Sequence, residues 1–143
     1  EQKVITEEVI MQTGFSTYTP KHCKYQKLFS YQRMNELVEE ARIVITHGGP
    51  SSFLMVLQKG KIPIVVPRKK HFNEHVNDHQ VDFCIEVARW KKNIILIMDI
   101  EELRGTLVNY DTIVRNLSDK PIANNKIFCE KFVRIVNDIV GED

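Results

Sequence analysis

The stretch RIVITHGGPSSFLMVLQKGKIPIVVP, residues 42–67, decides the fold. Its first segment (42–46) and its last (62–67) are rich in β-branched residues, the pattern of strands buried on both faces of a parallel sheet. Between them lie a glycine-rich loop, 47–52, and an apolar helical segment that ends at Gly60. A strand, a helix and a second strand in this order predict one β-α-β unit of a parallel α/β sheet.

Strands and helices alternate on both sides of this unit, which predicts a Rossmann-like parallel sheet with helices on both faces. We expect a single domain that spans residues 1–143. The last predicted helix has a broad apolar stripe that either completes the core or docks a partner. The further predicted elements are strands at 9–14, 24–30 and 93–98 and helices at 31–41, 73–90, 99–110 and 122–139.

The composition argues against several classes of protein. The 20 basic and 19 acidic residues leave a formal net charge of +1, so no global excess of positive charge points to nucleic acid. The three cysteines, Cys23, Cys84 and Cys129, form no C-x-x-C pair, which argues against a disulfide framework or a thiolate zinc site. No apolar run approaches the roughly 20 residues that cross a bilayer. We expect a cytoplasmic protein.

Two loops follow the strands of the opening unit, and both carry groups that suit a phosphate. In HGGPSS (47–52), glycines let a ligand approach the backbone and serines offer hydroxyls beside the positive end of the next helix. In PRKKH (67–71), three cations follow the second strand. Each loop alone also fits a structural or solvated turn. Because the carboxyl ends of parallel strands share one edge of a sheet, the two loops together predict a nucleotide-phosphate site.

The stretch HFNEHVNDHQ, residues 71–80, offers a competing interpretation. Its first five letters match H-x-x-E-H, in which two helical histidines hold zinc and the glutamate activates water; here these are His71, Glu74 and His75. Against zinc, three cations precede the pair, no further acidic ligand can be assigned, and His71 is expected to precede the helix. The alternatives are a solvated first turn and a polar helix start that faces a ligand with Glu74, Asn77, Asp78, His79 and Gln80.

The stretch ITHGGPSSFLMVLQKGKIPIVVPRKKHFNEHVNDHQVDF, residues 45–83, resembles the C-terminal, donor-binding domain of family 28 glycosyltransferases. It is most similar to the small bacterial capsule and exopolysaccharide subunits that work as half of a two-chain enzyme. The catalytic subunit of the eukaryotic two-chain N-acetylglucosaminyltransferase of dolichol-linked glycans is similar too. The resemblance depends on the order of a glycine loop, an apolar helix, a G-x-x-P-x-x-x-P strand (60–67) and a downstream N-D-H-Q (77–80).

The resemblance implies one half of a GT-B glycosyltransferase, with a UDP-sugar across the carboxyl edge of the sheet. His47 is the candidate catalytic base. No D-x-D occurs in the sequence, so neither a metal nor another cofactor is expected. The residues carried over from the family are His47, Gly48, Gly49, Ser51 and Ser52 for the diphosphate, Arg68 for the nucleotide, and Asp78, His79 and Gln80 for the sugar ring.

The implied reaction transfers a hexose, such as galactose or N-acetylglucosamine, from UDP with inversion to a lipid-linked saccharide in capsule or exopolysaccharide synthesis. A membrane-anchored partner subunit would carry the acceptor site and hold this chain at the inner face of the plasma membrane. Two rival functions remain open. The chain could be a non-catalytic activator of a partner transferase, or a zinc hydrolase built on His71, Glu74 and His75.

The sequence departs from the family pattern in two places. Some members carry a glutamate on the helix after the glycine loop that holds the ribose, and that position is Met55 here. The related small subunits also begin with a strand, a Gly-Thr turn and a helix that do not occur in this sequence. We therefore expect that an N-terminal strand-helix segment is lacking from the domain.

Overall fold

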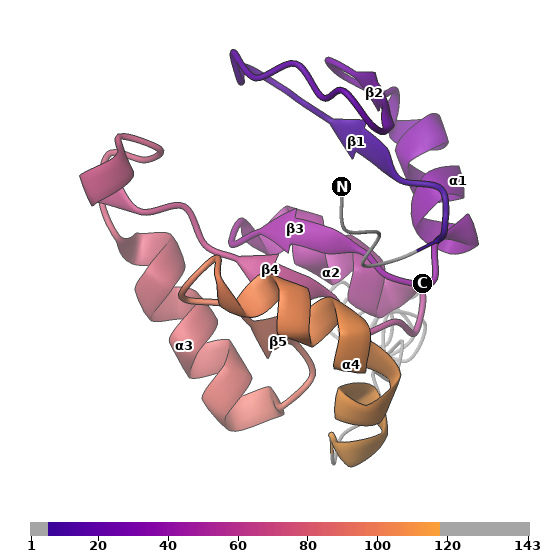
Figure 1. Ribbon diagram of the computed structural model, residues 1–143. Coiled ribbons are helices and arrows are strands. Elements are labelled where there is room, and N and C mark those ends of the chain that lie inside the picture. The colour runs from indigo at the N-terminus through magenta and orange to yellow at the C-terminus, as the bar shows by residue number, and fades with distance from the viewer. Residues whose placement is uncertain (1–5, 118–143) are drawn as a thin grey trace, which may run out of the picture.

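The computed structural model describes residues 6–117, in which strands and helices follow each other in the predicted order (Figure 1). The helix predicted at 122–139 lies outside the described residues. The strands are β1 (Ile10–Gln12), β2 (Lys24–Gln26), β3 (Ile45–His47), β4 (Ile64–Val66) and β5 (Ile95–Leu96). The helices are α1 (Tyr31–Glu40), α2 (Pro50–Gln58), α3 (His79–Lys91) and α4 (Glu102–Asn116), with a short 3-10 turn, η1 (Lys70–Phe72).

The central sheet consists of β3, β4 and β5, all parallel, with β4 in the middle. The prediction of a doubly buried strand is confirmed for β4, in which Ile64 and Val65 are 0% exposed. The same prediction is wrong for residues 42–46. There the strand begins only at Ile45, whose side chain is 47% exposed, because β3 lies at the edge of this sheet.

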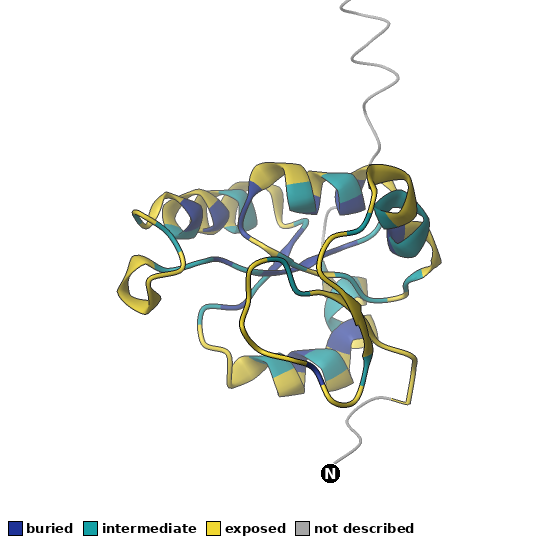
Figure 2. Ribbon diagram, turned by 90° about the horizontal axis from the view of Figure 1, so that it is seen from above, coloured by how far each residue is buried: buried dark blue, intermediate teal, exposed yellow. Residues whose placement is uncertain are grey.

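Helices cover both faces of the central sheet, which confirms the predicted fold class. On one face, Phe53 of α2 and Cys84 of α3 pack with Val65 in one buried cluster. On the other face, Tyr110 of α4 packs with Ile64 in a second cluster. The alternation of Ile64 and Val65 along β4 therefore sends neighbouring side chains into two different clusters. Figure 2 shows the buried strands between these layers of helices.

β1 and β2 form a second parallel pair, separate from the central sheet, where the sequence predicted a single sheet. In Figure 1 this pair lies above β3, and α1 leads from β2 to β3. Arg42, two residues after α1, donates to the carboxylates of Glu7 at 2.5 and 2.9 Å and of Asp111 in α4 at 3.1 Å. These ion pairs link the N-terminal part of the chain to the layer that covers the central sheet.

The helix predicted from about residue 73 begins six residues later, at His79. Asn73 adopts the left-handed conformation, with φ of 58°, which ends η1. The carboxylate of Glu74 accepts a hydrogen bond from the Lys69 N–H at 3.0 Å, and that of Asp78 accepts one from the Lys70 N–H at 2.9 Å. These side chains bond to the backbone of the preceding loop, so residues 73–78 fold back on that loop instead of continuing α3.

We predict that Lys61→Met lowers the free energy of unfolding by about 1 to 3 kcal/mol. The Lys61 ammonium donates to the carbonyls of Val38, Glu39 and Ala41, at 2.5 to 2.8 Å, and so satisfies the open C-terminal end of α1. The matched control is Lys59→Met, which removes only an ion pair with the exposed Glu39 carboxylate. Urea denaturation should show a change within about 0.5 kcal/mol for the control. Equal losses in the two variants would contradict the capping role.

Candidate functional site

The loops after β3 and β4 leave the sheet side by side, as predicted. His47, the last residue of β3, pairs in register with Val66, the last residue of β4. The next residues are in close contact, since a Cβ placed on Gly48 would lie 3.0 Å from the Cβ of Pro67 and 2.8 Å from the Sγ of Cys84. Only glycine fits there without displacing its neighbours. Gly48 is therefore required for the two loops and α3 to approach one another.

Cys84 is a residue of this site that the sequence did not indicate. It was predicted only as part of the apolar face of a helix, and it is indeed fully buried. Its thiol donates to the Gly48 carbonyl, with 3.6 Å between sulfur and oxygen, and burial raises the pKa of the thiol. No spacing rule pairs residues 48 and 84, so this contact could be found only in the folded chain.

The His47 ring folds back over its own loop. Its Nδ1 accepts a hydrogen bond from the Gly49 N–H at 2.9 Å, and its Nε2 lies 3.0 Å from the Ser52 Oγ. A Cβ on Gly49 would lie 2.4 Å from the ring Cε1, so the ring occupies space that only glycine leaves open. Both ring nitrogens are thus engaged within the loop. The role of His47 as the catalytic base stays a prediction.

The electrostatic surroundings of His47 favour its neutral form. Although His47 as a whole residue is exposed, partial desolvation of its ring is the main cause and Coulombic effects of Arg68 and His75 add to it, so the pKa lies below its ordinary value.

Helix α2 begins at Pro50, within the predicted loop 47–52, so the last three loop residues are helical; Gly49 is the N-cap. Proline suits this position because it has no N–H to satisfy. Gly49 supplies no capping side chain, Pro50 has no N–H, and the Ser52 N–H donates to the Gly49 carbonyl, so the Ser51 N–H is the first-turn donor that remains at the positive end of the helix. Ser51 is exposed beside this end and Ser52 is half-buried. This arrangement of N–H and O–H donors can bind an anion.

Arg68 is held in place by Gln80, the second residue of α3. The backbone N–H and the Nε–H of Arg68 both donate to the Gln80 Oε1, at 3.3 and 3.4 Å. Gln80 is only 8% exposed, so a buried acceptor orients the cation. The sequence identified both residues as site candidates, but it did not indicate that one supports the other.

The two lysines that follow Arg68 bond to their own surroundings. The Lys69 ammonium donates to the carbonyl of Met98, just after β5, which ties the second loop to the end of the third strand. Lys70 is exposed, and its backbone N–H is the donor to Asp78 described above. Of the three cations predicted for this loop, Arg68 is the one whose side chain is held by the start of α3.

The residues predicted to bind the sugar ring lie at the start of α3. Asp78 precedes the helix, and its carboxylate is bonded to the Lys70 N–H. His79 is exposed as the first helical residue, and Gln80 is turned inward to Arg68. The structure thus brings Gln80 to the loop edge and leaves His79 open to solvent. Their contact with a sugar stays a prediction.

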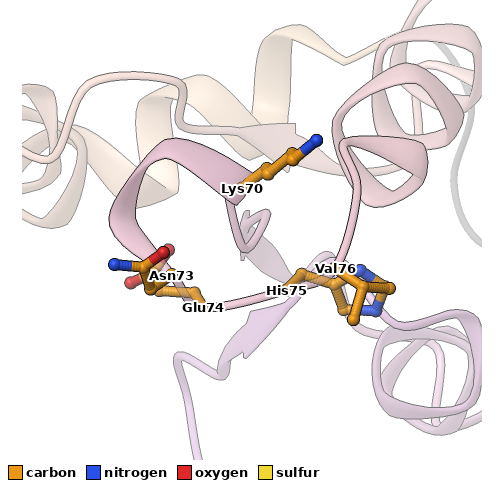
Figure 3. A pocket seen from close by; sticks show the side chains of 5 residues that line it. All are labelled: Lys70, Asn73, Glu74, His75 and Val76. Atoms are coloured by element: carbon orange, nitrogen blue, oxygen red, sulfur yellow. The ribbon is translucent and has the colours of Figure 1, made fainter.

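A hollow of about 480 Å³ lies within the loop between β4 and α3 (Figure 3). His71 belongs to η1, whereas Glu74 and His75 lie in the irregular segment after it, so the helical histidine pair of the zinc pattern is not formed. Within residues 6–117, no group of three or more His, Cys, Asp or Glu is arranged to hold a metal ion. The residues that line the hollow are Lys70, Asn73, Glu74, His75 and Val76.

A helix N-terminus and an arginine held by Gln80, on two loops at the carboxyl edge of a parallel sheet, fit a nucleotide site. Comparison with protein families agrees with it: the model of the glycosyltransferase family 28 C-terminal domain matches residues 1–110. The chain belongs to this family. No curated protein and no solved structure gave a significant match.

As a family 28 domain, the chain has a nucleotide-sugar-binding role in glycosyl transfer. The match extends from the β1–β2 pair to α4 and so includes both loops of the site. Among the described residues, none of the helices has the length and apolar character that a membrane span needs.

We predict that Gly48→Ala destabilises this family 28 domain by about 1 to 3 kcal/mol, because the added methyl group must displace Pro67 or Cys84. Gly105→Ala is the matched control. Gly105 lies in α4 with no atom within 4 Å of the added carbon, so alanine should stabilise the helix by up to about 1 kcal/mol. Thermal and urea unfolding of both variants measure the two effects. A neutral Gly48→Ala substitution would contradict the close packing of the loops.

Proposed function

We propose that this domain binds the diphosphate of a UDP-sugar at the start of α2 and supports transfer of the hexose, with inversion, to a hydroxyl of a lipid-linked saccharide. The observation that carries the proposal is the convergence of two loops, one with exposed Ser51 at the N-terminus of α2 and one with Arg68 held by Gln80, at the ends of strands that pair in register. A diphosphate matches this pair, because backbone N–H groups and a guanidinium both bind phosphate oxygens well.

The same groups suit the chemistry of the leaving group. When the bond to the anomeric carbon breaks, UDP gains negative charge on its diphosphate. Donors that are already aimed at this position stabilise the transition state more than the ground state. Because Gln80 and the glycine loop hold these donors in place, little reorganisation is needed when the charge develops. We therefore propose that the domain binds the diphosphate without a metal ion.

The proposed sugar position is the start of α3. Asp78 and His79 are exposed there, and Gln80 connects the same helix start to Arg68. A hexose attached to the bound diphosphate would thus meet the polar side chains at the start of α3. His47 is the proposed base within this chain, although its proton acceptance would require the bond to Gly49 to open.

In the same proposal, the acceptor is a lipid-linked saccharide held by a membrane-anchored partner subunit. The partner would keep this chain at the cytoplasmic face of the plasma membrane and would complete an enzyme of capsule or exopolysaccharide synthesis. The support is the resemblance of residues 45–83 to the small subunits of such two-chain enzymes. The family match indicates glycosyl transfer in general, whereas the two-subunit enzyme and its pathway belong to the proposal.

We predict that UDP binds the purified chain in the presence of EDTA with a dissociation constant tighter than about 1 mM. Arg68→Ala should weaken binding at least about tenfold, because a charge-assisted bond to phosphate contributes about 1.5 to 3 kcal/mol. Arg89→Ala is the matched control, since Arg89 is an exposed arginine in the last turn of the same helix that carries Gln80. Isothermal titration calorimetry measures all three proteins.

The titrations test the role of Arg68 and the need for a metal ion, and an assay of UDP release tests catalysis. Equal affinity of the Arg68 and Arg89 variants would exclude Arg68 from the site, and binding that appears only after Mg²⁺ is added would exclude a metal-independent diphosphate site. Release of UDP from UDP-galactose or UDP-N-acetylglucosamine in membranes that contain the partner tests catalysis. UDP binding without such release would favour a non-catalytic activator.

A further inference from the structure

We propose that His47 is a positioning residue that directs the hydroxyl hydrogen of Ser52 into the anion site. The ligand named here, a diphosphate, rests on the proposed function. The hydrogen-bonding arrangement of His47, Gly49 and Ser52 does not, because it is present in the chain without any ligand.

The bond to Gly49 determines which tautomer the ring adopts. A backbone N–H can only donate, so the Nδ1 that accepts from Gly49 at 2.9 Å must carry no hydrogen. A neutral imidazole then carries its single hydrogen on Nε2. That nitrogen lies 3.0 Å from the Ser52 Oγ, so Nε2–H donates and the serine oxygen accepts.

This tautomer in turn limits the Ser52 hydroxyl. Its oxygen accepts from His47, so its hydrogen is directed to another acceptor. The backbone N–H of Ser52 already donates to the Gly49 carbonyl at 3.0 Å, which fixes the residue in the first turn of α2. The side chain is half-buried beside the helix N-terminus. An anionic oxygen at this helix end is the matching acceptor for the hydroxyl hydrogen.

The surroundings of the ring keep it in this state. A protonated ring would place Nδ1–H against the Gly49 N–H, so that two donors would face each other. Burial and the charges of Arg68 and His75 oppose protonation, as the lowered pKa of His47 shows. The ring also lies against Gly49 so closely that a side chain at this position would collide with it.

The first test determines the tautomer in the free protein. Long-range ¹H–¹⁵N correlation spectra of the ¹⁵N-labelled chain at pH 7.5 distinguish the two nitrogens of each histidine ring, and His47→Asn assigns the His47 signals. We expect hydrogen on Nε2 and none on Nδ1. An Nδ1–H tautomer or an imidazolium at this pH would overturn the proposal. Because UDP is absent, this result does not depend on the proposed function.

The second test is a double-mutant cycle on UDP affinity. His47→Asn keeps an acceptor near the Gly49 N–H, because its Oδ1 lies close to the place of Nδ1, but it removes the donor to Ser52. We expect Ser52→Ala and His47→Asn each to weaken binding about tenfold, and His47→Asn to add less than about twofold when Ser52 is already alanine. Fully additive effects would overturn the proposal, since His47 would then act independently of Ser52.

A pH series gives a readout that a merely structural role would not change. As pH falls through the His47 pKa, the wild-type ring gains a proton on Nδ1 and a positive charge and the Gly49 bond is lost, so the pH profile of UDP affinity should contain a step from this ring. His47→Asn should lack this step. All other titrating groups are shared by the two proteins, so the difference between the two profiles belongs to His47. Identical profiles would overturn the proposal, whereas absence of UDP binding to the wild-type chain would overturn the diphosphate assignment and leave the measured tautomer standing.

Discussion

The close packing of Gly48 is the constraint on which the site depends. With no side chain at this position, the end of β3 lies against Pro67 after β4 and against Cys84 in α3. Three elements that are distant in the chain therefore meet at one point, and the Cys84 thiol adds a hydrogen bond to the Gly48 carbonyl. Because protein interiors are densely packed, even one methyl group at this point must move a neighbouring backbone or a buried sulfur.

Most polar side chains at this edge of the sheet bond to the protein itself. Gln80 orients Arg68, Asp78 and Glu74 accept from the backbone of the second loop, and His47 bonds within the first loop. Such bonds restrict the motion of loops before a ligand arrives. Binding to preorganised donors costs less free energy for ordering the protein. Such donors also stabilise a transition state that gains charge, because they need not rearrange when the charge develops.

The arrangement of the strands differs from the simplest form of the fold. β3 is an edge strand with a half-exposed isoleucine, and β1 and β2 pair only with each other among the described strands. A parallel sheet is usually covered on both faces, and here that holds fully for β4. The site is nevertheless built on β3 and β4, so its position depends on their mutual register and not on the β1–β2 pair.

Local sequence patterns predicted much of this protein. The β-branched runs, the glycine-rich loop and the Gly60 helix end indicated the β-α-β unit, because each depends on local backbone preferences and on the period of the apolar residues. The convergence of the two loops was also predictable, since parallel strands end at a common edge.

Tertiary contacts decided the rest. The late start of α3 depends on two carboxylates that bond to the backbone of another loop, and the exposure of β3 depends on its place at the sheet edge. The partners of Gly48, Arg68 and His47 depend on distances between atoms that no spacing rule reports. The sequence by itself determined that the loops 47–52 and 67–71 gather at one edge of the sheet, because the strands of a β-α-β unit are parallel and end at a common edge. Only the tertiary structure decided which of these groups stay exposed and which hold the loops, because that choice depends on packing between residues that are distant in the chain.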